Sequence, residues 1–380
     1  MVSAHRPPPE NSRVSLLPDA ETFRRLVDGS TTGFGPAAAR MALAGIAAPY
    51  RLAVAARNAA YDAGVLPRYA AGVPVISIGN LTLGGTGKTP LVAWAARAVL
   101  RCHRRPAIVS RGYGAGRGDQ SDEAAELGLL LPGVPHVADR DRVAAARAAV
   151  AGGAEVVLVD DGFQHRRLAR DLDIVAIDAT DPFGCGHLFP RGLLREPPAG
   201  LARADAVVLT RAHSVDAARR AEIRRLVLRT RAGREPDAWA EAVHRPMGLR
   251  DWSSAIRPLE QLAGRRVAAF AAIGNPAAFR ATLAAAGADV ADFQTFADHH
   301  RYAAGDLESL AAHASRTGAD LVVTTLKDLV KLRCETLAGI PLVALEIAID
   351  FTSGGDLLES LVGAATVNEP NPDRERGPVV

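Results

Sequence analysis

A glycine-rich segment between a strand-like run and a helical run most constrains how this 380-residue chain can fold. Residues 73–78 are rich in Val and Ile, which predicts a buried strand. Residues 79–90 read Gly-Asn-Leu-Thr-Leu-Gly-Gly-Thr-Gly-Lys-Thr-Pro, and residues 90–100 are typical of a helix that begins near Pro90. A strand, a glycine-rich turn and a helix in this order predict an anion-binding loop in an α/β fold.

The predicted loop has the groups that bind a nucleoside triphosphate. Its glycines allow backbone N–H groups to turn inward around phosphates without a Cβ clash. Lys88 would reach the β- and γ-phosphates, and the Thr89 hydroxyl would ligate Mg²⁺. We therefore expect ATP and Mg²⁺ as cofactors, bound by Thr82, Leu83, Gly84, Gly85, Thr86, Gly87, Lys88 and Thr89.

One alternative is a glycine-rich hairpin that contains Gly-Lys-Thr by chance. Thr82 stands where the general phosphate-loop spacing places its first glycine. Against the hairpin, a strand precedes the loop, a helix follows it, and Lys is rare in this chain. Lys and Arg together number 45, but the only lysines are Lys88, Lys327 and Lys331.

Strand-like and helix-like segments alternate along most of the chain. Strands are predicted at 73–78, 107–110, 134–138, 155–159, 173–177, 206–210, 267–272, 290–293, 321–324 and 342–346, with helices at 90–100, 140–151, 276–286 and 304–315. This pattern favours an α/β fold, with a P-loop NTPase-like parallel sheet, helices on both faces, and a smaller α/β C-terminal domain. The expected division is an N-terminal tail (1–34), a P-loop domain (35–215), a connection (216–262), a smaller domain (263–365) and a disordered tail (366–380).

Composition places further limits on the protein. Hydrophobic residues make up 48% and charged residues 23%, as in a globular protein with a core, and the net charge of +3 gives no general drive toward nucleic acid. Three widely spaced cysteines favour a reducing compartment. We find no secretory signal, and the apolar run at 41–50 is too short to span a bilayer, which takes about 20 residues.

Residues 35–64 are Ala-rich and helical in pattern, with several arginines. They could form a basic amphipathic helix that lies on a membrane surface. They could equally form a helix that packs on the domain. The residues alone leave both possibilities open.

A pair of carboxylates follows the predicted strand at 155–159. Asp160 and Asp161 would point to opposite faces if the strand continued, one toward a metal and the other toward the loop or substrate. An Asp-Gly turn is the alternative, but it leaves the nearby Gln164 and His165 without a role.

Five segments together resemble the tetraacyldisaccharide 4′-kinase family of lipid A biosynthesis, over roughly residues 35–355. They are the loop at 79–90, Ser-Arg-Gly-Tyr-Gly at 110–114, Asp-Asp-Gly-Phe-Gln-His at 160–165, Leu-Leu-Arg-Glu-Pro at 193–197, and Asp-His-His-Arg-Tyr at 298–302. Thr82 in place of glycine is itself typical of the family. Cys185, His187 and Leu326 differ from the residues expected there.

The resemblance implies a phosphotransferase that moves the γ-phosphate of ATP to the 4′-hydroxyl of a tetraacylated glucosamine disaccharide 1-phosphate. The acceptor is a lipid A precursor, so the enzyme is expected at the cytoplasmic face of the bacterial inner membrane. It would be a peripheral or monotopic monomer without a transmembrane span. The resemblance also favours membrane contact for the helix at 35–64.

Residue roles also follow from the resemblance. Asp122 is expected to be the catalytic base, paired with His299, with His300 as the open alternative. The metal would be held by Thr89, Asp160 and Glu196, with substrate or supporting roles for Asp161, Gln164, His165, Arg195 and Glu123. Taken alone, Asp122 and Glu123 would suggest a helix N-cap with a first-turn acid.

Two other functions would use the same loop. One is a nucleotide-driven switch or partitioning-type ATPase that acts through partner binding. The other is a small-molecule kinase of the cytosol. The switch does not need Asp122 paired with His299 or a basic amphipathic helix, and the cytosolic kinase would show no dependence on detergent or liposomes.

Overall fold

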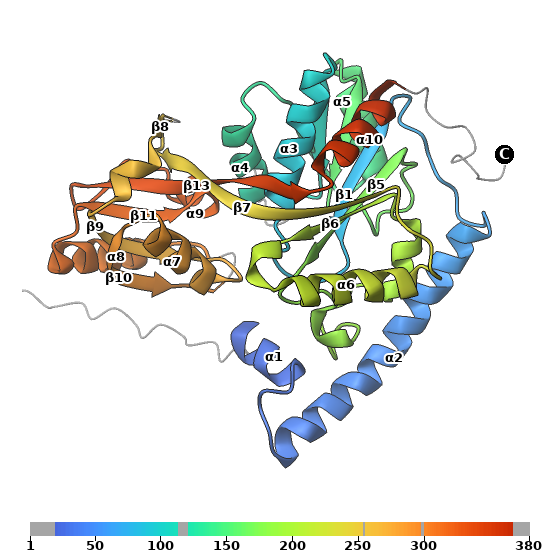
Figure 1. Ribbon diagram of the computed structural model, residues 1–380, viewed down its shortest axis with the longest axis horizontal. Helices are drawn as coiled ribbons and strands as arrows, with labels where there is room; N and C mark the ends of the chain where they lie inside the picture. The colour runs from blue at the N-terminus through green and yellow to red at the C-terminus, as the bar shows by residue number, and fades with distance from the viewer. Residues whose placement is uncertain (1–19, 113–120, 254, 298–299, 368–380) are drawn as a thin grey trace, which may run out of the picture.

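The computed structural model describes residues 20–112, 121–253, 255–297 and 300–367. Figure 1 shows two lobes joined by two long strands, with a long helix that projects from the larger lobe. A 13-stranded sheet runs through both lobes of this described part, with eleven strands in the order β10-β9-β11-β13-β7-β6-β5-β1-β4-β2-β3. The other two, β8 (Ile256–Arg257) and β12 (Thr336–Leu337), pair with β7 and β13. The α/β fold with a parallel sheet that the sequence predicts is therefore confirmed.

The N-terminal lobe is built on six parallel strands. They are β1 (Val75–Asn80), β2 (Pro106–Ser110), β3 (His136–Ala138), β4 (Val156–Asp160), β5 (Leu172–Asp178) and β6 (Ala206–Thr210). Each predicted strand exists within two residues at either end. β1, β2, β4 and β6 are buried at every position, so they are continuous apolar runs rather than alternating ones.

Helices cover both faces of this part of the sheet. One face packs against α3 (Lys88–Arg101), α4 (Asp122–Leu130) and α10 (Gly355–Val367). The other face packs against α5 (Arg142–Ala151), α6 (Ala217–Thr230) and the short helix η2 (Pro198–Arg203). Because all the strands are parallel, their carboxyl ends meet along one edge, where ligands bind in folds of this kind.

The C-terminal lobe contains β9 (Arg266–Ala271), β10 (Asp289–Thr295) and β11 (Leu321–Thr325), with helices α7 (Pro276–Ala285), α8 (Ala304–Thr317) and α9 (Leu326–Leu332). The sequence predicts these elements except α9, a short helix that starts directly after β11. The three strands of this lobe are parallel to one another and to the first part of β13 (Ile340–Ser353).

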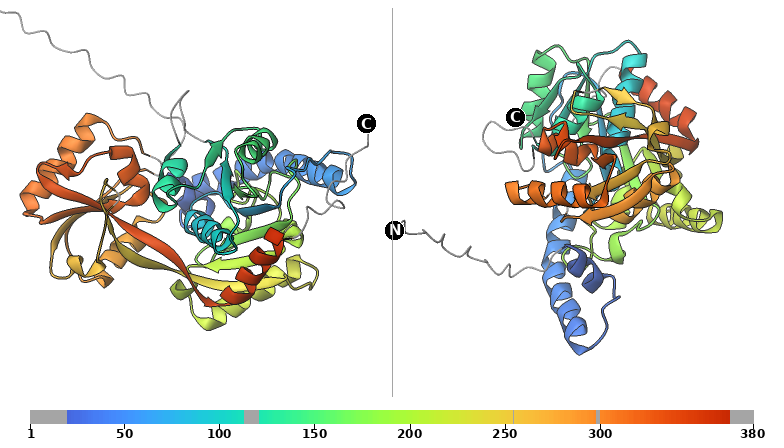
Figure 2. Two further views of the ribbon diagram at one scale, coloured as in Figure 1. Left: turned by 90° about the horizontal axis from the view of Figure 1, so that it is seen from above. Right: turned by 90° about the vertical axis from the view of Figure 1, so that its left-hand side faces the viewer.

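The long strands β7 (Ala238–Arg250) and β13 join the lobes. β7 pairs in parallel with β6 through 238–241, and its remainder pairs antiparallel with β13. Residues 216–262, expected to be a connection, thus supply α6 and a strand of the shared sheet. The chain then returns to the N-terminal lobe as α10, beside α3, although its residues fall in the range expected for the smaller domain (Figure 2).

Within residues 20–74, two helices precede β1. α1 (Ala20–Val27) lies in the range expected to be a tail, so that range contains an ordered helix. α2 (Phe34–Asp62) is the helix expected at 35–64, and Figures 1 and 2 show it extending beyond the body of the lobe. Only Ala47 and Tyr61 are buried along its 29 residues. None of the helices within the described ranges is long and apolar enough to cross a membrane.

Candidate active site

The glycine-rich loop connects β1 to α3, as the sequence predicts. Gly84 and Gly87 have positive φ of 103° and 79°, and Gly87 is the N-cap of α3. A left-handed N-cap without a Cβ lets the backbone turn sharply into the helix. The N–H groups that open α3 therefore point into the cleft at the carboxyl edge of the sheet.

The outer side of the loop is tied to neighbouring segments by hydrogen bonds. The Thr210 hydroxyl donates to the Thr86 carbonyl at 2.8 Å, and Arg211 Nη2 donates to the Gly85 carbonyl at 2.9 Å. On the other side, Leu83 N–H donates to the Leu193 carbonyl at 2.7 Å. These bonds occupy two carbonyl groups and one N–H group of the loop, whose other side faces the cleft. Thr210 and Arg211 are not among the predicted site residues, although Thr210 ends the predicted strand at 206–210 and Arg211 follows it at the edge of the sheet where ligands bind.

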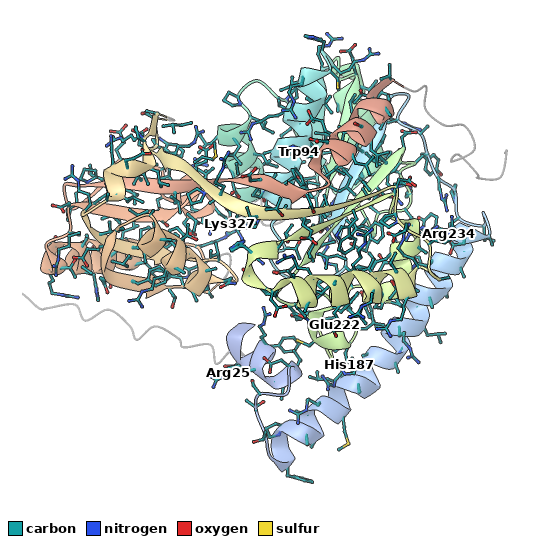
Figure 3. All side chains as sticks on the ribbon, viewed as in Figure 1. Arg25, Trp94, His187, Glu222, Arg234 and Lys327 are labelled. Carbon is teal, nitrogen blue, oxygen red and sulfur yellow. The ribbon has the colours of Figure 1, made fainter. Side chains whose placement is uncertain are left out.

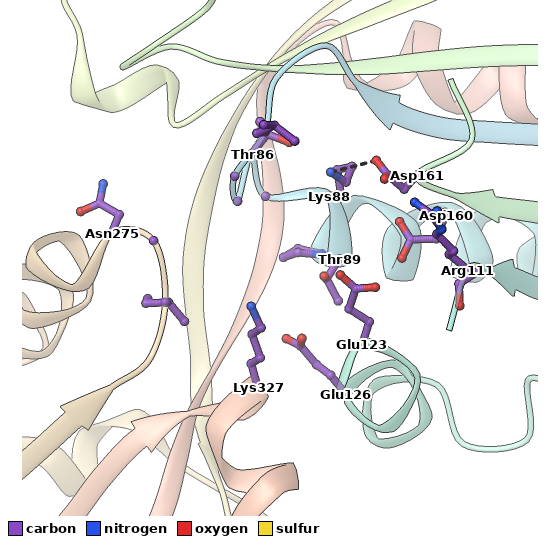
Figure 4. Close-up of a pocket in the computed structure, with 18 of the residues that line it drawn as sticks. Thr86, Lys88, Thr89, Arg111, Glu123, Glu126, Asp160, Asp161, Asn275 and Lys327 are labelled. Atoms are coloured by element: carbon purple, nitrogen blue, oxygen red, sulfur yellow. Dashed lines mark ion pairs between the residues drawn. The ribbon is translucent and has the colours of Figure 1, made fainter. Parts of the chain in front are cut away.

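Lys88 is oriented by two groups at the floor of the cleft. Its Nζ donates to Asn80 Oδ1 at 3.0 Å and lies 3.2 Å from Asp161 Oδ1, the ion pair dashed in Figure 4. Arg195 Nη1 donates to the other oxygen of Asp161 at 2.5 Å. Burial acts to raise the pKa of Asp161, but the charges of Lys88 and Arg195 outweigh it and hold that pKa well below its ordinary value.

Asp160 and Asp161 both line the cleft, which differs from the expectation that they point to opposite faces. The reason is that β4 ends at Asp160 and Asp161 has a left-handed φ of 55°, so the alternation of a strand no longer applies. Asp160 is buried, and burial together with the nearby Glu123 carboxylate raises its pKa to about 7, against the opposing charge of Lys88. The cleft thus holds two neighbouring carboxyl groups whose pKa values are shifted in opposite directions, that of Asp160 upward and that of Asp161 downward.

The donor set of this floor fits a magnesium ion. Thr89 and Asp160 both line the cleft, and the pKa of Asp160 is raised by burial and then by the Glu123 carboxylate, so a cation bound beside it would stabilise its charged form. The described residues contain no group of three or more His, Cys, Asp and Glu side chains suited to hold a metal. Mg²⁺ usually takes one or two carboxylates, with phosphate oxygens completing its shell. This pair suits a metal that arrives with a nucleotide.

Glu196, expected to be a metal ligand, has a different setting. Its buried carboxylate accepts hydrogen bonds from Arg203 Nη2 at 2.7 Å, Gln164 Nε2 at 3.0 Å and Asn58 Nδ2 at 3.2 Å. These three donors attach Glu196 to α2, the segment after β4 and η2, while Glu196 also lines the cleft. Its role as a metal ligand stays a prediction.

His165 also lines the cleft. Burial, followed by the charges of Arg142 and Arg170, lowers its pKa to about 4, so the imidazole is neutral at physiological pH.

α2 forms one wall of the cleft through its C-terminal half. The Tyr50 hydroxyl donates to the Arg195 carbonyl at 2.7 Å, and Arg57 Nη2 donates to the Gln164 carbonyl at 2.5 Å. Asn58 adds its bond to Glu196. The projecting helix is therefore attached to the same loops that position Asp161.

The N-terminus of α4 brings three acids to the space between the lobes. Glu123 and Glu126 line the cleft, whereas Asp122, with its side chain 36% exposed, lies at the side and approaches Lys331 Nζ of α9 at 3.8 Å. Ser121 is the N-cap, because its hydroxyl accepts from Ala124 N–H at 3.3 Å. The N-cap interpretation of Asp122 is therefore wrong.

His299, the expected partner of Asp122, lies outside the described residues. His300 is described: its Nε2 lies 2.9 Å from Asp306 Oδ2, and its ring stacks on Phe296 at 4.9 Å between centroids. His300 thus has its own carboxylate partner within the C-terminal lobe.

A cleft of about 980 Å³ is lined by the phosphate loop together with Asp160, Asp161, Glu123 and Glu126. Figure 4 shows the phosphate loop and acids on one side and two C-terminal-lobe residues, Asn275 and Lys327, on the other. Arg111, which follows β2, lies next to Asp160 in the same view. The cleft is large enough for a nucleotide and part of a second substrate, since ligand pockets occupy about 300–1,000 Å³.

Known proteins are similar to this chain in sequence and in fold. A family profile described as "Tetraacyldisaccharide-1-P 4'-kinase" matches residues 39–365. A tetraacyldisaccharide 4′-kinase from Anaeromyxobacter sp. (strain K) is 44% identical over 347 residues, which cover 86% of this chain and 90% of that protein. One from Geobacter metallireducens is 40% identical over 308 residues, 76% of this chain and 88% of that protein.

A solved structure agrees with the fold. LpxK from Aquifex aeolicus, crystallised in complex with ATP, superposes with a TM-score of 0.67 at 29% identity, covering 86% of this chain and 99% of that chain. The family match spans both lobes, the cleft and most of α2. The chain belongs to the tetraacyldisaccharide 4′-kinase family.

Proposed function

We propose that this chain transfers the γ-phosphate of ATP to the 4′-hydroxyl of a tetraacylated glucosamine disaccharide 1-phosphate. The observation that carries the proposal is the arrangement of Lys88, Asp160 and Asp161 around one phosphate loop, in a cleft walled by an apolar-faced helix. A kinase for a lipid acceptor needs a triphosphate site beside a surface that can meet lipid. Each residue named below comes from one chain, so a monomer suffices.

The phosphates would lie against the loop and the first turn of α3. Lys88, oriented by Asp161 at 3.2 Å, would offset the charge of the β- and γ-phosphate oxygens. Arg195 fixes Asp161 and thereby the ammonium that Asp161 orients. Thr89 and Asp160 would hold Mg²⁺, which, when bound, offsets charge on the phosphates.

Asp122 is the proposed base that accepts the proton of the 4′-hydroxyl, with His299 as its supporting imidazole. The position of Asp122 at the start of α4, between the lobes, supports this role. Because phosphoryl transfer has a loose transition state, positioning of the hydroxyl matters more than base strength. The wall of the cleft next to Asp122 is acidic because it contains Glu123 and Glu126. The loop after β4 would be held by Gln164, His165 and Glu196.

We also propose that α2 rests on the cytoplasmic face of the inner membrane as a peripheral element. Phe34, Met41 and Leu52 are 89%, 68% and 71% exposed, and their spacing places them along one side of the helix. The opposite side carries Tyr50 and Asn58, which bind the loops of the cleft. A lipid held in the membrane would meet the cleft where this helix enters it.

A transfer assay tests the proposal. Purified protein, γ-labelled ATP, Mg²⁺ and the tetraacyldisaccharide 1-phosphate in mixed micelles should yield labelled lipid. Lys88→Ala should reduce turnover by about 10²- to 10³-fold, as when one preorganised charge contact to the transition state is removed. The exposed Arg316→Ala serves as a control. Release of inorganic phosphate by the wild type without labelled lipid would favour the switch ATPase instead.

A further inference from the structure

A second cavity lies between α2 and residues 186–198, the segment that contains Arg195 and Glu196. It encloses about 450 Å³, which is within the usual range for ligand sites. Among the described residues, it shares no lining residue with the active-site cleft. Figure 3 labels His187, one of its lining residues, beside α2. We call this cavity the α2 groove.

The wall that α2 contributes consists of small side chains and one arginine. Ala44, Ala47, Ala48 and Arg51 line the groove, and they are spaced by three and four residues, so they share one face of the helix. Alanine side chains fill little of the space between this face and the opposite segment. The groove is therefore open along α2 and has a guanidinium group toward one end.

The opposite wall is a turn that its own backbone holds in place. The Leu194 N–H donates to the His187 carbonyl at 3.0 Å, and the Gly192 N–H donates to the Leu188 carbonyl at 3.0 Å. Leu188 and Leu194 are buried and form the apolar floor of the groove. Because hydrogen bonds fix this wall, the groove is formed before any ligand arrives.

Positive charge is concentrated at this apolar groove. Arg51 and Arg191 line it, and none of the described Asp and Glu residues does. Arg191 Nη1 donates to the Val27 carbonyl at 2.9 Å, which orients its guanidinium group. Burial, followed by the charge of Arg191, lowers the pKa of His187, so its ring is neutral at physiological pH. Guanidinium groups bind phosphate oxygens through paired N–H donors, so the groove suits a ligand with one phosphate and an apolar part.

The groove adjoins the side of α2 that we propose rests on the membrane. Ala48 lies seven residues after Met41 and four before Leu52, so the three share one side of the helix. Met41 and Leu52 are 68% and 71% exposed. A helix with arginines beside an apolar side is suited to bind anionic lipids at a membrane surface. A lipid beneath this side would reach the groove past Ala48.

We propose that the α2 groove binds one anionic phospholipid of the membrane, with its phosphate on Arg51 and Arg191 and one acyl chain along Leu188 and Leu194. This inference rests on the proposed contact of α2 with the membrane, but not on phosphoryl transfer. A zwitterionic lipid has the same phosphate, but its cationic headgroup would add a positive charge beside two arginines. The groove therefore favours a lipid such as phosphatidylglycerol.

A short-chain lipid tests the site without a membrane. Dihexanoyl phosphatidylglycerol, kept below the concentration at which it forms micelles, is titrated into the full chain by calorimetry. We expect saturable binding of one lipid per chain, and at least about tenfold weaker binding of dihexanoyl phosphatidylcholine. Binding that does not saturate, or equal affinity for the two lipids, would overturn the proposal.

Variants separate the groove from a general attraction of anionic lipid to basic surface. Arg191→Gln should weaken binding of the probe about tenfold or more, because it removes a charged hydrogen-bond donor. Ala48→Trp should weaken it as much by filling the groove, with no change in charge. Arg316→Gln, which removes an exposed charge from the C-terminal lobe, should match the wild type.

Thermal unfolding should show that each variant is folded. Arg51→Gln alters an exposed position of α2 and tests the charge again if Arg191→Gln is unstable. Unchanged binding in Ala48→Trp would contradict a site in the groove. So would an equal loss of affinity in Arg316→Gln, because only general attraction would then explain the binding.

The acceptor lipid distinguishes the remaining occupant. If the groove instead held an acyl chain of the tetraacyldisaccharide 1-phosphate, this lipid at equal concentration would displace the probe, and the proposal would be refuted. We expect the probe to stay bound. The binding assay contains no ATP and measures no transfer. Failure of the wild type to phosphorylate the acceptor would therefore refute the kinase function without affecting this site.

Discussion

The imidazole of His244, on β7, lies directly against Gly87, the N-cap of α3. A Cβ at Gly87 would overlap the Nε2 and Cε1 atoms of this ring. Burial, followed by the charge of Arg211, lowers the pKa of His244 to about 4, so the ring is neutral. A strand that joins the two lobes thus forms the support beneath the phosphate loop.

Gly87→Ala should therefore damage both folding and nucleotide binding. The left-handed φ of 79° costs a non-glycine residue about 1–2 kcal/mol, and the overlap with His244 adds to it. We expect a lower Tm and a loss of ATP affinity, measured by thermal unfolding and calorimetry. Gly85→Ala is the matched comparison for stability, because a Cβ there meets open space. Equal Tm values for the two variants would contradict the role of His244.

The raised pKa values of Asp160 and Glu126 predict how stability depends on pH. Each carboxyl has a folded-state pKa of about 7, above its ordinary value near 4, so the folded state holds more protons between these pH values. This contribution to stability is complete below pH 4 and is lost as pH rises through 7. Asp160→Asn should flatten the decline in Tm between pH 5 and 8 relative to wild type. An unchanged slope would refute the assignment.

Asp122→Asn and Glu123→Gln should have different effects. Removing the proposed base should lower kcat by about 10²- to 10⁴-fold while ATP affinity stays near wild type. Removing the Glu123 charge should chiefly lower the pKa of Asp160, which it now helps to raise. Steady-state kinetics over pH 6–9 would distinguish them. Wild-type turnover in Asp122→Asn would eliminate Asp122 as the base.

Leu52→Asp should weaken binding to lipid vesicles. Leu52 is 71% exposed on the outer side of α2, where a carboxylate would have to remain hydrated near the bilayer. Sedimentation with anionic vesicles measures the bound fraction. Leu357→Asp is the control, because Leu357 is 51% exposed and belongs to α10, which packs beside α3. Equal loss in both variants would argue against contact through α2.

Much of the fold could be predicted because its signals are local. The β-branched runs, the glycine spacing around Lys88 and the carboxylates after β4 each depend on neighbours in sequence. The strands β1 to β6 and β9 to β11 are predictable in this way. β7 is not, because Pro246 and Gly248 interrupt its strand-like pattern and its pairing with β13 spans about a hundred residues. α9 was missed because it is only seven residues long.

The sequence by itself determined that a phosphate loop stands between a buried strand and a helix, with Asp160 and Asp161 at the end of another strand. Only the tertiary structure decided what those residues face. It turned Asp161 toward Lys88 and Arg195, gave the Glu196 carboxylate three hydrogen-bond donors, and placed His244 under Gly87 and Lys327 across the cleft. The physical reason is that hydrogen bonds and charge contacts between distant segments depend on how the two lobes pack, and no local pattern encodes that packing.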